Sequence, residues 1–190
     1  PMAFFIMLSF FFLYLIYEKE RLRHYLLAAI FAGFSIATKW TGGVLIVPIF
    51  LAHLLACLKR KKGAAGILLD RRLLILFLFV ILGFFLAVPY GLLNFPFLYG
   101  VLMEWIGSAK FTSIQPGQVN SWIYYLTRSL NHGMSLPLEL LSLTGIAYCI
   151  YHHSKKDILL VSFPLAFFLI QGSYVLHAGR YIFPIVPFLI

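Results

Sequence analysis

The chain alternates between long apolar segments and short polar loops. One stretch, residues 24–58, carries a single charge, Lys39. As one helix it would be roughly 50 Å long, whereas the hydrocarbon core of a bilayer is about 30 Å thick. We therefore expect it to break at the sequence TKWTGG (38–43), whose two glycines favour a corner. The apolar segments that this pattern predicts are 2–17, 24–38, 41–58, 73–92, 137–151, 158–175 and 181–190.

These segments predict an all-α fold, a polytopic transmembrane helix bundle of about seven spans or part-spans. The composition agrees, with 62% hydrophobic and 11% charged residues, whereas a soluble domain has about 25% charged residues. A cleaved signal peptide does not explain the pattern, because apolar segments recur to the last residue. The chain also begins and ends inside apolar segments. We therefore expect residues 1–190 to be a fragment of a transmembrane domain, with further sequence on both sides.

The basic residues indicate an orientation. Eleven of the 15 Lys and Arg residues lie in three loops, 18–23, 59–72 and 152–156. Alternating spans place all three loops on one side, which the positive-inside rule assigns to the cytoplasm. The net charge of +9 is therefore a topological signal and does not predict nucleic-acid binding. We expect a multi-pass protein of a prokaryotic plasma membrane.

The opposite, extracytoplasmic side is expected to carry the function. Its largest feature is the loop 93–136, which is too apolar for a free loop. The spacing of apolar residues predicts one helix in the membrane plane at 98–111 and a second at 121–130, separated by a turn at 115–118. The other four basic residues and all three tryptophans also fall on this side: Lys39, Lys110, Arg128, Arg180, Trp40, Trp105 and Trp122.

Cations at the outer interface have two interpretations, and both stay open. Lys39, Arg128 and Arg180 would bind a lipid phosphate by charge-assisted hydrogen bonds. Alternatively, they are cations at helix ends whose side chains reach the interface. His132 lies four residues after Arg128 and would share its helix face, and Tyr181 would pack against a sugar or headgroup beside Arg180.

No cofactor or metal site is predicted. The two cysteines, Cys57 and Cys149, lack a CxxC spacing and are expected to be free thiols in helices. The histidines form no HExxH motif, and Walker, dinucleotide and GxSxG motifs are missing. A divalent metal shared between an outer histidine and a carboxylate outside this sequence stays open.

Four segments, in order, resemble a family of membrane glycosyltransferases. They are GFSIATKWTGGVLIVPIFL (33–51), AVPYGLLNFPFL (87–98), SWIYYLTRSLNHGMSLPLELLSLTGI (121–146) and GRYIFPIVPFLI (179–190). The set is similar to the dolichyl-phosphate-mannose protein mannosyltransferases and the aminoarabinose transferases, which have the GT-C fold. One departure is Asn94, where many relatives are expected to carry Asp.

The resemblance implies an inverting enzyme that moves a sugar from a polyprenyl-phosphate donor to a protein, lipid or glycan at the extracytoplasmic face. A carboxylate would remove the acceptor proton, and cations would stabilise the departing phosphate. In this family the key acid lies in the first outer loop, which we expect to precede Pro1. Within this sequence, Glu104 is a candidate base whose alternative role is a solvated polar face.

Two other classes stay open. A secondary transporter or a flippase for lipid-linked substrates would share the composition, although such proteins often contain inverted repeats, and none is found. A non-catalytic membrane scaffold would also explain the apolar segments, but it leaves the loop 93–136 unexplained.

Overall fold

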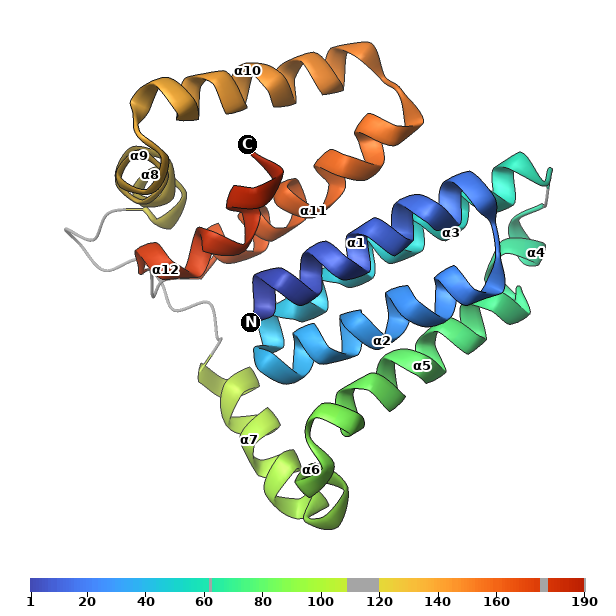
Figure 1. Cartoon of the computed structure of the whole chain (residues 1–190). Helices are drawn as coiled ribbons and strands as arrows, with labels where there is room; N and C mark the ends of the chain where they lie inside the picture. The colour runs from blue at the N-terminus through green and yellow to red at the C-terminus, as the bar shows by residue number, and fades with distance from the viewer. Residues whose placement is uncertain (62, 109–119, 175–177, 190) are drawn as a thin grey trace. The chain divides into compact units, whose positions relative to one another are not determined.

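The computed structural model describes residues 1–61, 63–108, 120–174 and 178–189 (Figure 1). Every regular element among them is helical, and no strand occurs in these ranges. The predicted all-α class is therefore confirmed. The chain divides into two compact units, Pro1–Leu93 and Asn94–Ile190, and each is described by itself.

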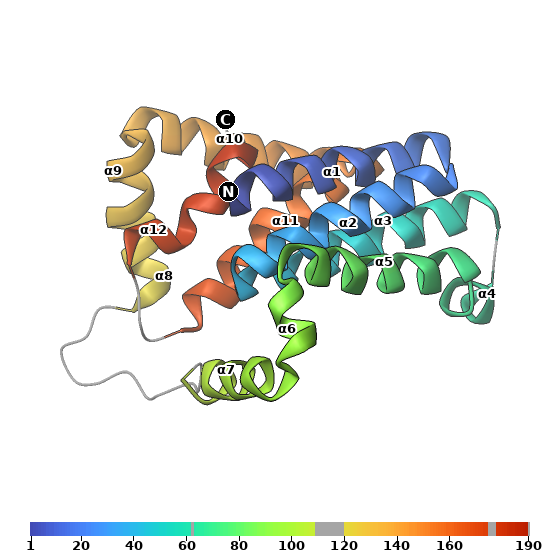
Figure 2. The ribbon, with the colours of Figure 1, turned by 60° about the horizontal axis from the view of Figure 1, so that its bottom comes forward.

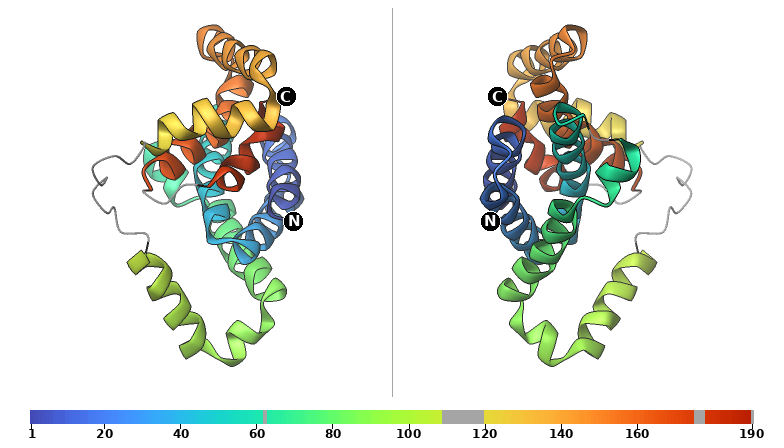
Figure 3. Two further views of the ribbon diagram at one scale, coloured as in Figure 1. Left: turned by 90° about the vertical axis from the view of Figure 1, so that its left-hand side faces the viewer. Right: turned by 90° about the vertical axis from the view of Figure 1, so that its right-hand side faces the viewer.

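The first unit is a bundle of four long helices whose directions alternate along the sequence, so the first and third run one way and the second and fourth run the other. The ribbons of its four long helices run side by side in Figures 1 and 2, and Figure 3 views them roughly along their axes. Their contact is apolar, with Ile6, Leu13 and Leu76 fully buried. The elements are α1 (Met2–Lys19), α2 (Leu22–Thr38), the 3₁₀ helix η1 (Trp40–Leu45), α3 (Ile46–Lys59), α4 (Ala64–Leu68), α5 (Arg71–Ala87) and α6 (Pro89–Leu93).

The predicted corner at residues 38–43 is confirmed. Helix α2 ends at Thr38, whose hydroxyl donates to the Phe34 carbonyl oxygen at 2.9 Å. Lys39 is extended, and η1 then leads the chain into α3. Gly42 lies directly against Ser35, where a side-chain carbon would collide with the backbone of α2. The chain can therefore reverse direction within a few residues.

Two of the basic loops meet at one end of the first unit. The Arg60 Nε atom lies 3.2 Å from a carboxylate oxygen of Glu20, and the Arg72 Nη1 atom donates to the Glu20 carbonyl oxygen at 2.9 Å. The Lys59 ammonium also donates to the Tyr17 carbonyl oxygen at 2.6 Å. The loops 18–23 and 59–72 therefore share an end, as the expected alternation of the first four segments requires.

The second unit contains a helical hairpin and a helix that turns away from it. The hairpin is α10 (Leu136–His152) followed by α11 (Lys155–Gly172), and α10 lies at 117° to the preceding helical segment 121–134. Phe163 and Phe167 are buried in the core of this unit. Its other elements are α7 (Phe95–Ser108), α8 (Ser121–Tyr124), the π-helix η2 (Tyr125–Leu130), α9 (Asn131–Met134), α12 (Gly179–Ile182) and the 3₁₀ helix η3 (Phe183–Phe188).

Among the residues that the structure describes, two or three helical segments are candidates for membrane spans. By length and composition, Met2–Lys19 and Trp40–Lys59 are each long and apolar enough to cross a membrane, and the bent pair 121–152 would make a third span. Helices α2, α5 and α10 have 17 residues each, which is about 25 Å of helix and slightly short of a bilayer core. Helix α11 begins with three charged residues. The expected seven-span bundle is therefore not confirmed.

Several predicted boundaries shift for local reasons. The segment 73–92 is helical only to Ala87, because the next helix begins at Pro89 and the residue before a proline disfavours helical geometry. The helix predicted at 121–130 continues to Met134. The last segment is a short helix and a 3₁₀ turn containing Pro184 and Pro187. Lys110 and the turn predicted at 115–118 lie outside the described residues.

Candidate functional site

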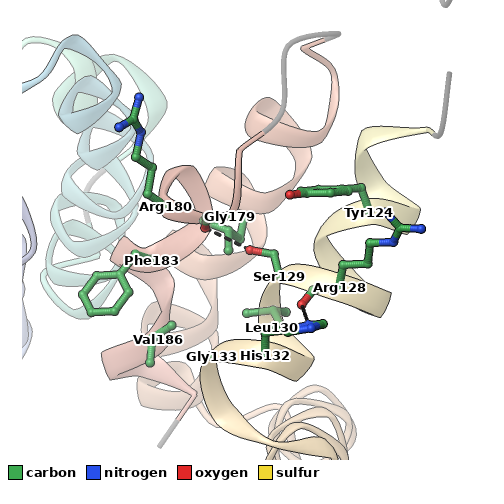
Figure 4. Close-up of a pocket in the computed structure, with 11 residues that line it drawn as sticks. Tyr124, Arg128, Ser129, Leu130, His132, Gly133, Gly179, Arg180, Phe183 and Val186 are labelled. Atoms are coloured by element: carbon green, nitrogen blue, oxygen red, sulfur yellow. Dashed lines mark hydrogen bonds between the residues drawn. The ribbon is translucent and has the colours of Figure 1, made fainter.

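The candidate site is a pocket in the second unit, between the helical segment 121–134 and the segment 178–188 (Figure 4). Its volume is about 480 Å³. Three basic side chains, Arg128, His132 and Arg180, share it with polar, small and apolar ones. The lining residues are Tyr124, Arg128, Ser129, Leu130, His132, Gly133, Gly179, Arg180, Ile182, Phe183 and Val186.

Side-chain hydrogen bonds hold the two walls together. The Ser129 hydroxyl donates to the Gly179 carbonyl oxygen at 2.9 Å, which joins residues 50 positions apart. At the start of the same wall, the Ser121 hydroxyl donates to the Tyr174 carbonyl oxygen at 2.6 Å. Arg128 and Arg180 come from distant parts of the sequence, and these bonds hold them at the same pocket.

A buried tyrosine supports the wall from behind. The Tyr125 side chain has no exposed surface, and the Gln171 amide of α11 lies 3.5 Å from its hydroxyl oxygen. A tyrosine hydroxyl is protonated and uncharged at neutral pH. It therefore contributes a neutral hydrogen-bonding group, and the charge of the pocket comes from its basic residues.

Arg128 and His132 are positioned by an unusual helical segment. Residues Tyr125–Leu130 form a π-helix between α8 and α9, a geometry that is rare and frequently found at functional sites. The His132 Nδ1 atom lies 2.7 Å from the Arg128 carbonyl oxygen, so the ring stays against its own helix. Arg128 and His132 both line the pocket.

The rim of the pocket is cationic. In Figure 4 the guanidinium groups of Arg128 and Arg180 extend on opposite sides, with the Tyr124 hydroxyl between them. No Asp or Glu occurs among the described residues that line the pocket. Such a rim suits an oxyanion, because guanidinium groups bind phosphate and carboxylate by charge-assisted hydrogen bonds. It offers no carboxylate for acid–base chemistry or metal binding.

The other predicted site residues lie elsewhere. Tyr181 does not line the pocket, but its ring centre is 5.6 Å from the Arg180 guanidinium carbon. Lys39 belongs to the first unit, at the end of α2. Glu104 is exposed on α7 and lines none of the described pockets. Asn94 precedes α7, where its side-chain oxygen accepts from the Phe97 amide at 3.3 Å, a helix-entry role that Asn fulfils as well as Asp.

An apolar pocket lies next to the cationic one. Its volume is about 260 Å³, it shares Leu130 with the cationic pocket, and α10, α11 and η3 contribute most of its walls. Glu139 of the first turn of α10 also lines it and is only 7% exposed. The two pockets together offer a charged rim and an apolar interior.

Sequence reasoning did not identify Ser129 and Gly179 as partners, because nothing local marks a contact over 50 residues. Tyr124 also lines the pocket, although nothing in its local sequence separates it from an ordinary interfacial aromatic residue. The feature of the sequence that pointed to this pocket was the four-residue spacing of Arg128 and His132.

Comparisons with protein-family models, curated proteins and solved structures gave no match to this chain.

Proposed function

We propose that the protein is an integral-membrane glycosyltransferase that moves a sugar from a polyprenyl-phosphate donor to an acceptor at the extracytoplasmic face. The proposal includes a polytopic topology of about seven spans. One observation carries it: Arg128, His132 and Arg180 line one pocket, although two of them are about 50 residues away from the third. The resemblance of four sequence segments to GT-C glycosyltransferases supports it.

The chemistry of the pocket suits a lipid-linked phosphate better than a soluble anion. The guanidinium groups of Arg128 and Arg180 would contact phosphate oxygens, and each such charge-assisted bond contributes about 1.5–3 kcal/mol. The neighbouring apolar pocket, which shares Leu130, would receive part of the isoprenoid chain. A free sugar phosphate would leave that apolar surface unused.

In the proposed reaction, Arg128 and Arg180 stabilise the departing lipid phosphate. A protonated His132 donates to it from Nε2, while its Nδ1–H stays on the Arg128 carbonyl oxygen. Tyr181, beside Arg180, packs against the headgroup. Lys39 is a further candidate for a phosphate contact. The general base is a carboxylate that the family resemblance places outside this sequence, with Glu104 as the candidate within it.

A binding experiment tests the phosphate site directly. The chain in detergent is titrated with farnesyl phosphate and, separately, with farnesol, which has the same chain without the charge. We expect Arg128→Gln and Arg180→Gln each to weaken farnesyl phosphate binding by roughly tenfold or more, with farnesol binding unchanged. Lys155→Gln, which removes an exposed cation of α11 outside the pocket, is the matched control. Equal affinity of all variants would reject the site.

A transporter remains the second candidate, because the 117° bend between 121–134 and 136–152 resembles the broken helices of transporters. The two functions leave different products. A transferase forms a new glycosidic bond in vesicles supplied with a polyprenyl-phosphate sugar and an acceptor. A transporter moves the labelled lipid between leaflets and forms no such bond.

A further inference from the structure

A second polar cluster lies in the first unit, far from any residue of the cationic pocket in sequence. It consists of His53 and Cys57 on α3 and Asp70 at the start of α5. All three side chains are buried: His53 and Cys57 have no exposed surface, and Asp70 is 6% exposed. The candidate ligand atoms lie within 4.8 Å of one another. An imidazole, a thiol and a carboxylate are the three ligand types that protein zinc sites use.

Two of the three distances between these ligand atoms match a tetrahedral metal centre. The Cys57 sulfur lies 3.4 Å from His53 Nε2 and 3.6 Å from Asp70 Oδ2. Zinc–sulfur and zinc–nitrogen bonds of about 2.3 and 2.1 Å at a tetrahedral angle separate the two ligand atoms by about 3.5 Å. The distances from the Cys57 sulfur to His53 Nε2 and to Asp70 Oδ2 are therefore already those that a bound zinc ion requires.

The surroundings resemble the outer shell of a metal site. The Tyr25 hydroxyl lies 3.3 Å from His53 Nδ1, the ring nitrogen that would not bind the metal. Such a partner on the second nitrogen orients a ligating imidazole. The Asp70 Oδ1 atom accepts from the Arg72 amide at 2.9 Å, which fixes this carboxylate and leaves Oδ2 directed at the sulfur. The Ile67 carbonyl oxygen lies 3.1 Å from Nε2 and accepts from that nitrogen when it is protonated, so zinc binding requires the other tautomer, with the proton on Nδ1 facing the Tyr25 hydroxyl.

Arg60 is the cation closest to the cluster, and it is already compensated. Its Nη1 atom lies 3.2 Å from Asp70 Oδ2, its Nε atom lies 3.2 Å from Glu20 Oε2, and its Nη2 atom donates to the Cys57 sulfur at 3.3 Å. Two carboxylates therefore balance this guanidinium. A cysteine thiolate would add a further negative charge, and a divalent ion would neutralise it.

We propose that His53, Cys57 and Asp70 bind one Zn²⁺ ion that joins the end of α3 to the start of α5. Binding forms the sulfur–zinc bond with release of the Cys57 thiol proton to solvent, and no redox step is involved. The role is structural, because the three ligands are buried and come from two different helices that the ion would hold together. It is independent of the proposed transferase activity and of the cationic pocket.

Metal analysis of the untagged chain, purified in detergent with a reductant, tests the proposal. We expect one equivalent of zinc by mass spectrometry. After chelation, we expect uptake of one Co²⁺ with the visible bands of tetrahedral cobalt and a thiolate charge-transfer band. The Cys57→Ala and His53→Gln variants should each bind no stoichiometric zinc and show no thiolate charge-transfer band with Co²⁺. Cys149→Ala, which removes the other free cysteine, on α10, should retain both.

The zinc content and cobalt spectrum of the wild-type chain test the proposed site even if a ligand variant fails to fold. A chain that carries no zinc and gives no tetrahedral cobalt spectrum would overturn the proposal, and the cluster would then be a hydrogen-bonded network alone. Retention of the thiolate band in Cys57→Ala would also overturn it. Loss of zinc binding with unchanged farnesyl phosphate binding would leave the proposed function intact.

Discussion

Gly33 of α2 and Gly83 of α5 face each other where the two helices are in backbone contact. A Cβ atom built on Gly83 would lie 2.5 Å from the Ile30 carbonyl oxygen, and one on Gly33 would lie 2.8 Å from the Gly83 carbonyl carbon. Helix α2 is buried on this side through small residues, including Ala29 and Ala32. Small residues allow such close approach in membrane helix pairs. The two glycines therefore set how closely α2 and α5 pack.

We expect Gly83→Ala to destabilise the first unit. The added methyl group meets rigid backbone atoms, and forcing such overlap into a packed interface costs about 1–3 kcal/mol. Thermal unfolding in detergent would show a lower midpoint. Gly145→Ala on α10, where nothing lies within 4 Å of the new carbon, should leave the midpoint unchanged or slightly higher. An unchanged midpoint in Gly83→Ala would contradict the α2–α5 contact.

Ser129→Ala should loosen the cationic pocket. The substitution removes the hydrogen bond from the Ser129 hydroxyl to the Gly179 carbonyl oxygen, which contributes about 1 kcal/mol. Farnesyl phosphate affinity should fall by a few fold, because Arg180 then loses its fixed position relative to Arg128. Ser162→Ala is the matched control, since its hydroxyl bonds only within α11, to the Leu159 carbonyl oxygen. Equal effects of the two substitutions would count against the proposed pocket.

Ser135→Gly should stabilise the bend between the segment 121–134 and α10. Ser135 has φ 67° and ψ 151°, a region that is essentially restricted to glycine and costs other residues about 1–3 kcal/mol. Glycine relieves this strain, although it also adds freedom to the unfolded chain. We therefore expect a higher unfolding midpoint for Ser135→Gly than for Ser135→Ala, which keeps the strained backbone. The reverse order would show that the bend does not strain this residue.

Asp70 combines a helix cap with an ion pair, and two substitutions separate them. Asn at this position can still accept from the Arg72 amide, whereas Ala cannot, and a lost cap costs about 0.5–2 kcal/mol. Both changes remove the charge that pairs with Arg60. In the presence of a chelator, Asp70→Ala should therefore unfold at a lower temperature than Asp70→Asn. Identical midpoints would exclude a capping role.

The fold class and many helix boundaries were predictable because their causes are local. Uninterrupted apolar segments predict helices, TKWTGG (38–43) predicts the corner, and Arg128 and His132 share a face through helical spacing alone. The same local rules misplaced the end of α5, since the pattern 73–92 was followed without regard to Pro89. They do not decide the number of spans, because hydropathy does not reveal where a helix ends or bends, and two or three candidate spans occur in the described part of the chain.

Packing between distant segments decided the rest. Nothing in the sequence relates Ser129 to Gly179, or His53 and Cys57 to Asp70, because hydrophobic periodicity specifies which face of a helix is buried and not its partner. His53 and Cys57 lie four residues apart on α3, a signal that was available from the sequence, but the carboxylate that completes the cluster follows only from the turn through α4. The sequence by itself determined an apolar helical protein with cations at segment ends. The tertiary structure decided which cations share a pocket, since helix packing alone brings residues 50 positions apart within hydrogen-bonding distance.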